Sequence, residues 1–245
     1  MMSCPCCAGN MHGRRAVLGT AAAGLLAAAW PGRARAADPV PRTNLSGEQA
    51  LRRLQEGNDA FRADKPLVPP ANASTRHQRR IELARGQAPF CVLVGCSDSR
   101  VPPEVLFGRD LGELFIVRNA GNTVDTAALG SIEYGVGVLG VPLVVVLGHE
   151  KCGAVAAAVE MVERDATFPG VIGEMVQPIV PAVLSVRNAP GDLLDNAVRA
   201  NARRVAIRLR TQSSVIRDAL NARTVKIVAA RYGLEEGEVS WMEDV

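Results

Sequence analysis

The chain has 245 residues, of which 48% are hydrophobic and 22% are charged, and its formal net charge is +3. That length suits one large domain or at most two small ones, and the composition is ordinary for a soluble globular protein. So small a net charge lacks the electrostatic footprint of a nucleic-acid-binding or membrane-binding protein, and we expect neither partner.

Residues 1–36 have the organisation of an export signal. Arg14 and Arg15 precede an apolar run, residues 16–30, and the small-residue site Ala-Arg-Ala follows at 34–36. The run is shorter than the roughly 20 residues that a membrane-spanning helix needs, so we expect no stable membrane span in the mature chain. Paired arginines beside a modestly apolar run favour the twin-arginine route, which predicts a periplasmic or secreted protein.

The cysteines divide between this signal and the mature chain, and the sequence has six of them: Cys4, Cys6, Cys7, Cys91, Cys96 and Cys152. The first three precede the apolar run and would leave with the signal, so we interpret their C-x-C-C spacing as incidental rather than metal-binding. The remaining three are an odd number, too few for a disulfide framework in a domain of this size. Cys91 stands inside an apolar run and is predicted to be a small core residue.

A polar linker, residues 37–45, leads into a domain that we place at residues 46–245. Two helical patterns open it, at 46–63 and at the basic stretch 74–86. Four continuous apolar runs are typical of buried parallel strands, at 90–95, 114–117, 142–148 and 224–229. Helical patterns lie between them, at 124–138, 152–163 and 192–221. This alternation predicts an α/β fold with a mainly parallel β-sheet covered by helices on both faces.

One glycine pattern imitates a dinucleotide-binding loop. Gly135, Gly137 and Gly140 satisfy G-x-G-x-x-G. A dinucleotide fingerprint needs a strand before it and a helix after it, whereas here a helical pattern precedes and an apolar run follows. We therefore expect a small-residue face for close helix packing, followed by a turn.

Polar residues follow the first and third predicted strands, where ligands bind in open α/β sheets. Cys96 follows the first run, and His149 and Cys152 follow the third. Two thiolates and one imidazole suit zinc, and three protein ligands leave a fourth position for water, or for Asp98. A buried cysteine is more often a core residue and a lone histidine more often structural, so these residues alone leave both interpretations open.

Three other kinds of site are excluded by counting and spacing. The only histidines are His12, His77 and His149, so the mature chain cannot hold a metal with three of them. His149-Glu150 is not followed by the second histidine of a metalloprotease H-E-x-x-H motif. A cysteine-dependent phosphatase needs five residues between its cysteine and arginine, and only three separate Cys96 from Arg100.

Taken together, these motifs resemble those of the β-class carbonic anhydrases. The resemblance rests first on Cys96-Ser-Asp-Ser-Arg100 and on His149-x-x-Cys152-Gly153. It extends over about residues 45–245, through Phe115-Ile-Val-Arg-Asn-Ala-Gly-Asn122, Ser131-Ile-Glu-Tyr134 and the closing segment 225–239. The family fold implies a four-stranded, mainly parallel β-sheet flanked by helices, with an N-terminal helical arm for dimerisation.

The resemblance implies a carbonate dehydratase, which reversibly hydrates carbon dioxide to bicarbonate and a proton through zinc-bound hydroxide. One Zn²⁺ per chain would be held by Cys96, His149 and Cys152. Asp98 and Arg100 would form the catalytic dyad, and Asp98 would become a fourth zinc ligand in a closed state of the site.

The resemblance also implies a substrate pocket and an oligomer. Gln87 matches a family glutamine that reaches the site of a neighbouring subunit and donates to the substrate oxygen. The apolar wall around carbon dioxide would be formed by Phe115, Ala120 and Tyr134, with Gly153 lining the same pocket. A homodimer would be the minimal assembly, with contacts from the helical patterns at 46–63 and 74–86.

Two alternatives stay open at this point. The first is a related zinc hydrolase that acts on carbon disulfide or carbonyl sulfide with the same ligands. The second is a non-enzymatic protein that binds zinc or bicarbonate. Against the second, the three predicted ligands, the dyad and Gln87 are all present.

Overall fold

A computed structural model of the chain describes residues 40–65 and 73–242, and the side chains of all of these except residues 73–76. The predicted export signal, residues 1–36, lies outside the described residues together with its three cysteines. Within the described residues, every helix is too short or too polar to cross a membrane.

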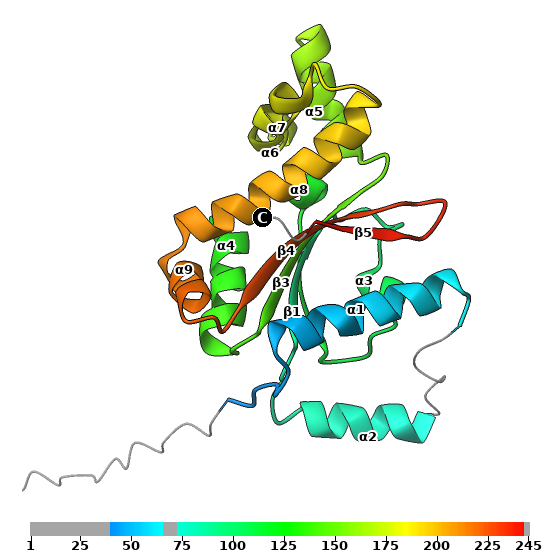
Figure 1. The fold of residues 1–245 in the computed structure, drawn as a ribbon, viewed down its shortest axis with the longest axis vertical. Helices are drawn as coiled ribbons and strands as arrows, with labels where there is room; N and C mark the ends of the chain where they lie inside the picture. The colour runs from blue at the N-terminus through cyan, green and yellow to red at the C-terminus, as the bar shows by residue number, and fades with distance from the viewer. Residues whose placement is uncertain (1–39, 66–72, 243–245) are drawn as a thin grey trace, which may run out of the picture. The chain divides into compact units, whose positions relative to one another are not determined.

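The chain folds around one twisted β-sheet with the strand order β2-β1-β3-β4-β5 (Figure 1). Its strands are β1 (Cys91–Gly95), β2 (Leu114–Arg118), β3 (Leu143–His149), β4 (Lys226–Tyr232) and β5 (Val239–Met242). The first four strands run parallel and β5 is antiparallel to β4. The predicted α/β fold is confirmed, but the sheet has five strands rather than four. The four residues of β5 are too few to show a strand pattern in the sequence.

Helices precede and separate the strands: α1 (Gly47–Arg62), α2 (Ala73–Leu83), α3 (Pro103–Leu106), η1 (Ala120–Asn122), α4 (Thr126–Glu133), η2 (Tyr134–Val138), α5 (Gly153–Arg164), α6 (Ile172–Val176), η3 (Gln177–Ile179), α7 (Val180–Val186), α8 (Leu193–Gln212) and α9 (Ser214–Asn221). The single helix predicted at 192–221 is two helices. Ser213 is extended and caps α9, its hydroxyl accepting a hydrogen bond from the Ile216 amide at 3.1 Å. The helices from α6 to α7 were not predicted.

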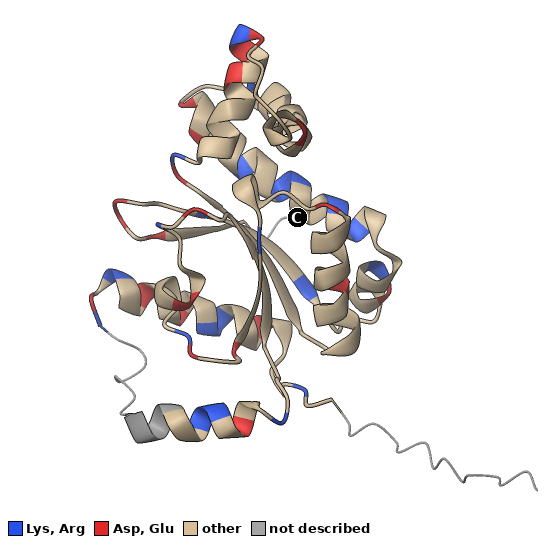
Figure 2. Cartoon of the chain, turned by 180° about the vertical axis from the view of Figure 1, so that it is seen from behind, with Lys and Arg blue, Asp and Glu red and all other residues tan. Residues whose placement is uncertain are grey.

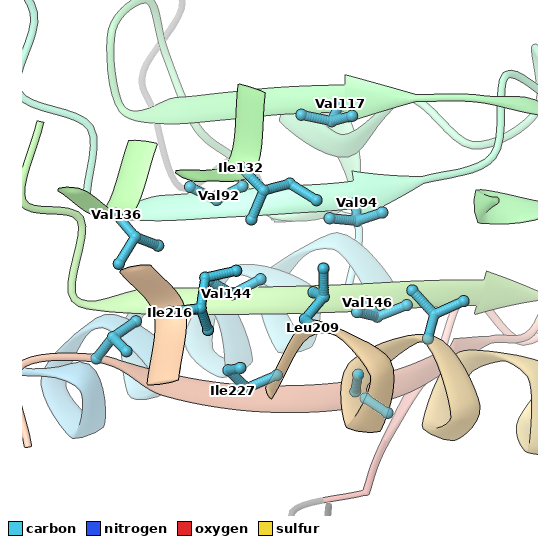
Figure 3. Close-up of a cluster of buried hydrophobic side chains, with 14 of the residues drawn as sticks. Val92, Val94, Val117, Ile132, Val136, Val144, Val146, Leu209, Ile216 and Ile227 are labelled. Carbon is cyan, nitrogen blue, oxygen red and sulfur yellow. The ribbon is translucent and has the colours of Figure 1, made fainter. Parts of the chain in front are cut away.

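The strands are buried on both faces, which explains their unbroken apolar runs. On one face Val92, Val94 and Val144 meet Ile132 of α4 and Leu209 of α8 (Figure 3). The helices α1 and α3 cover the other face (Figure 1). The side of α8 turned away from the core carries a succession of arginines (Figure 2). Every central strand is therefore fixed from two sides, which makes its carboxyl end a rigid place for a site.

Helix α1 begins with a capping box and packs on its own sheet. The Ser46 hydroxyl accepts from the Gln49 amide, and the Gln49 side chain accepts from the Ser46 amide. Leu51 and Leu54 are buried in the core of the same chain. The Asn58 side chain donates to the Gly237 carbonyl at 2.8 Å and accepts from the Val239 amide. The contacts that this segment is expected to make with a second copy of the chain remain a prediction.

Gly57 is the tightest contact between α1 and the rest of the fold. A Cβ at this position would lie 2.1 Å from the Phe107 carbonyl oxygen, which belongs to the backbone and cannot turn aside. We expect Gly57→Ala to lower the free energy of unfolding by about 1–3 kcal/mol. Gly130→Ala is the matched control, since a Cβ there meets nothing within 4 Å and alanine favours the helix. Urea unfolding of both variants checks this, and equal stabilities would contradict it.

The glycine pattern that resembles a nucleotide loop serves packing, as predicted. Added Cβ atoms would lie 2.5 Å from Val92 at Gly135 and 2.9 Å from Val215 at Gly137. These glycines therefore let η2 approach the sheet and α9 closely. Gly140 has φ +67° and makes the turn into β3.

Candidate functional site

Two neighbouring parallel strands deliver the predicted ligands to one edge of the sheet. Cys96 directly follows β1, and His149 is the last residue of β3, which pairs with β1. Cys152 is the N-cap residue of α5. The two sulfurs lie 4.0 Å apart, and the three donor atoms all lie within 4.8 Å of one another. The structure thus brings together three residues that are 53 and 3 positions apart in the chain.

The chemistry of this group fits a tetrahedral metal. Zinc–sulfur bonds of about 2.3 Å at a tetrahedral angle place two sulfurs about 3.8 Å apart, close to the separation found. His149 is fully buried, and its Nδ1 lies 2.9 Å from the Glu150 carbonyl oxygen. Because a carbonyl only accepts, Nδ1 carries the proton and Nε2 keeps its lone pair. Nε2 is buried without a hydrogen-bond partner in the described part of the chain, which suits a metal-binding nitrogen.

The surroundings of the two sulfurs favour a thiolate at Cys96. The Gly121 amide donates to the Cys96 sulfur at 3.2 Å. A hydrogen bond from Cys152, with another from the Gly121 amide, lowers the pKa of Cys96. The same Cys96–Cys152 hydrogen bond, together with burial, raises the pKa of Cys152. The pair therefore shares one proton, which a divalent metal would displace.

Asp98 is held beside this group by Arg100. The Arg100 Nε and Nη2 donate to the two carboxylate oxygens at 2.9 and 2.7 Å, and the Arg100 amide donates to Oδ1 at 2.9 Å. Oδ2 lies 3.9 Å from His149 Nε2. Hydrogen bonds from Arg100 keep the pKa of Asp98 far below its usual range. The carboxylate is therefore ionised, fixed in orientation and turned toward the donor group.

Two further residues shape the site, and no role was predicted for either of them. Arg118, at the end of β2, donates to the carbonyls of Cys96 and Asp98 at 2.7 and 2.6 Å. Asn201 of α8 is buried and donates to the Gly121 carbonyl at 2.9 Å. A polar residue within the apolar stripe of α8 was the signal that could have identified Asn201. Arg118 fixes the loop that carries Cys96, and Asn201 fixes the turn whose Gly121 amide donates to the Cys96 sulfur.

The predicted pocket residues fall into two groups. Ala120 directly precedes Gly121, and Gly153 directly follows Cys152, so both lie next to the sulfurs. Phe115 pairs with Val92 on β1, four residues before Cys96, which places it about 13 Å from that residue along the strand.

The remaining two predicted pocket residues also lie away from the sulfurs. The ring of Tyr134 is 6.2 Å from that of Phe115, and Tyr134 is 47% exposed. Gln87 is exposed and precedes β1, at the opposite end of the strand from Cys96. One chain alone does not bring Gln87, Phe115 or Tyr134 to the cysteine–histidine group.

A family profile and two relatives of known name point to the same family. The profile of the family described as carbonic anhydrase matches residues 91–239. The carbonic anhydrase of Mycolicibacterium smegmatis is 40% identical over 196 residues, which are 80% of this chain and 93% of that protein. Carbonic anhydrase 2 of Mycobacterium tuberculosis is 40% identical over 199 residues, 81% of this chain and 93% of its own length.

Solved structures agree with the sequence relatives. CafA, a β-carbonic anhydrase of Aspergillus fumigatus, superposes with a TM-score of 0.62 at 26% identity, over 80% of this chain and 91% of the other. A chain from the tetrameric β-carbonic anhydrases of Sordaria macrospora superposes with a TM-score of 0.61 at 26% identity, over 78% of this chain and 96% of the other. Sequence and structure therefore point to the same family.

Proposed function

The chain belongs to the β-class carbonic anhydrase family, and on that premise we propose that Cys96, His149 and Cys152 hold one zinc ion for the reversible hydration of carbon dioxide to bicarbonate. One observation carries the proposal: two sulfurs and an unpartnered imidazole nitrogen converge within 4.8 Å. The relatives described above bear the carbonic anhydrase name, so the comparisons do not favour a carbon disulfide or carbonyl sulfide hydrolase.

Zinc bound there would act as a Lewis acid that lowers the pKa of a coordinated water. Two thiolates place more negative charge beside the metal than neutral imidazoles would. The hydrogen bond from the Gly121 amide to the Cys96 sulfur withdraws part of that charge. The backbone of the chain thereby moderates the electron donation of this sulfur.

Asp98 is the residue that we propose to orient the attacking oxygen. Its carboxylate is ionised at neutral pH, so it accepts a hydrogen bond rather than donating one. Arg100 donates to both oxygens and so keeps the carboxylate from becoming a further metal ligand. When an O–H group donates to Asp98 Oδ2, the lone pair of the O–H oxygen points toward the carbon of carbon dioxide. The closed state, in which Asp98 itself binds zinc, would require Arg100 to release it.

The substrate pocket would be completed by a second copy of the chain. Ala120 and Gly153 lie beside the sulfurs of their own chain. Gln87 and Tyr134 are exposed and lie away from that site, so they are free to reach the site of another copy. We therefore propose a homodimer or a larger homo-oligomer. In it, Gln87 donates to the developing bicarbonate oxygen, and Phe115 and Tyr134 form the apolar wall.

Export is the remaining part of the proposal. It is supported by the paired arginines, the apolar run of about 15 residues and the Ala-Arg-Ala site of residues 1–36. The twin-arginine route would carry the chain to the periplasm or beyond, and loss of the signal would leave a mature chain that begins near residue 37.

Protein recovered from the periplasm of a bacterial host tests activity and location together. We expect one zinc per chain and carbon dioxide hydration in a stopped-flow assay with a pH indicator. The variant with Arg14→Lys and Arg15→Lys is the control for location, because it should remain inside the cell with the same zinc content. Zinc without hydration would contradict the proposed reaction, and an unchanged location of the double variant would contradict the export route.

A further inference from the structure

The loop between β3 and α5 supports both halves of the site with its backbone. It consists of Glu150 and Lys151, between the ligands His149 and Cys152. The Glu150 carbonyl accepts the hydrogen bond from His149 Nδ1 at 2.9 Å. The Lys151 carbonyl accepts from Arg100 Nη2 at 3.3 Å. One two-residue loop thus sets the direction of a metal-binding imidazole and supports the arginine that holds Asp98.

This loop is held in place by the carboxylate of Glu150. Its Oε2 accepts from the Leu234 amide at 2.9 Å, in the turn between β4 and β5. The Glu150 amide donates to the Tyr232 carbonyl at 2.8 Å, so the residue is attached to the end of β4 at two points. Lys151 has φ +52°, a conformation that is costly for a residue with a side chain. Such a loop needs external support to keep its carbonyls in place.

Charged groups surround the same carboxylate. Lys151 Nζ lies 3.4 Å from Oε1, and Arg231 Nη2 lies 4.0 Å from Oε2. Arg231 itself is held by Asp195, whose oxygen lies 2.8 Å from both its Nε and its Nη2. The side chain of Glu150 is therefore part of a network that connects α8, β4 and the metal-binding loop.

We propose that the Glu150 side chain is a positioning residue of the metal site. It acts through its own backbone carbonyl on His149 and, through the next carbonyl, on Arg100. The inference rests on the zinc site proposed above. Hydrogen-bond partners of metal-binding histidines fix the tautomer and the ring direction, and their loss typically lowers metal affinity 10- to 100-fold. Here the hydrogen bond to the Leu234 amide stabilises such a partner.

Two conservative variants separate position from charge. Glu150→Asp keeps the negative charge but is one methylene too short to reach the Leu234 amide, whereas Glu150→Gln keeps the reach and the acceptor oxygen but loses the charge. We expect zinc loss to a chelator to be about 10-fold faster or more in Glu150→Asp, and within about threefold of the parent rate in Glu150→Gln. Glu235→Gln is the matched control, because Glu235 also lies near Lys151 but is exposed, and its zinc loss should not change.

A second readout does not require metal. The sequence has three histidines, so long-range ¹H–¹⁵N spectra of the metal-free protein resolve the His149 ring, assigned by its absence in His149→Gln. We expect the Nδ1–H tautomer in the parent and in Glu150→Gln, and a mixture in Glu150→Asp. Leu234→Pro removes the same hydrogen bond from its donor side and should behave like Glu150→Asp.

The outcomes separate this inference from the proposed function. Equal zinc retention and equal tautomers in the Asp and Gln variants would overturn it. So would a defect in Glu150→Gln alone, since that would make the charge decisive. A parent protein that binds no zinc would instead contradict the metal site itself.

Discussion

Replacing Cys152 with serine is expected to reduce zinc binding to a trace and, with it, the hydration of carbon dioxide. The Cys152 sulfur lies 4.0 Å from that of Cys96 at the start of α5, and both are buried. A serine hydroxyl is a far poorer zinc ligand than a thiolate and does not ionise near neutral pH. We expect less than about 0.1 zinc per chain after dialysis against a weak chelator, measured by atomic emission.

Cys91 provides the control for this substitution. It is also a buried free cysteine, but it stands within β1 in the apolar core, and burial raises the pKa of its thiol. Cys91→Ala should keep one zinc per chain and lose about 1 kcal/mol of stability through the small cavity. If Cys152→Ser kept its zinc, or if Cys91→Ala lost it, the ligand assignment would be wrong.

Asp98→Asn is expected to keep zinc but to lower kcat/KM for hydration about 100-fold or more. The amide has the same shape as the carboxylate, so the fold and the donor group should remain. Its NH₂ group, however, cannot accept from Arg100 Nη2, and one of the two hydrogen bonds of the pair becomes a contact between donors. The oxygen that should accept from the attacking water then loses its charge, its fixed direction, or both.

The matched control for that variant is Asp218→Asn, an exposed aspartate of α9 far along the chain from the site. Stopped-flow hydration assays should find it equal to the parent protein. Full activity of Asp98→Asn at full zinc occupancy would remove Asp98 from the mechanism and would leave its pair with Arg100 as a structural ion pair.

The sequence alone predicted those parts of the structure that follow from a local pattern of residues. Continuous apolar runs identified four of the five strands, because strands buried on both faces have no polar alternation. The polar residues that follow two of these strands identified the donor group, since parallel strands bring their carboxyl ends to one edge. The β5 strand and the break at Ser213 were missed, because each depends on a few residues whose conformation is set by tertiary contacts.

The site was less predictable where backbone groups, rather than side chains, make the supporting hydrogen bonds. The Glu150 and Lys151 carbonyls support His149 and Arg100, and a carbonyl has no signature in a sequence. Arg118 belongs to the Phe115–Asn122 motif, but its hydrogen bonds to the Cys96 and Asp98 carbonyls become visible only in the structure. Gln87 presents the opposite case. The resemblance alone gave its role, and a single chain does not bring it to the site.

X-ray absorption at the zinc edge of the purified protein tests the central claim most directly, because it counts the ligand types around the metal. We expect two sulfurs at about 2.3 Å and two nitrogen or oxygen neighbours at about 2.0–2.1 Å, which match Cys96, Cys152, His149 and one exchangeable ligand. The Cys152→Ser variant, reloaded with zinc, should not reproduce the two-sulfur spectrum. A shell with no sulfur, or with four, would contradict the zinc site and the mechanism built on it.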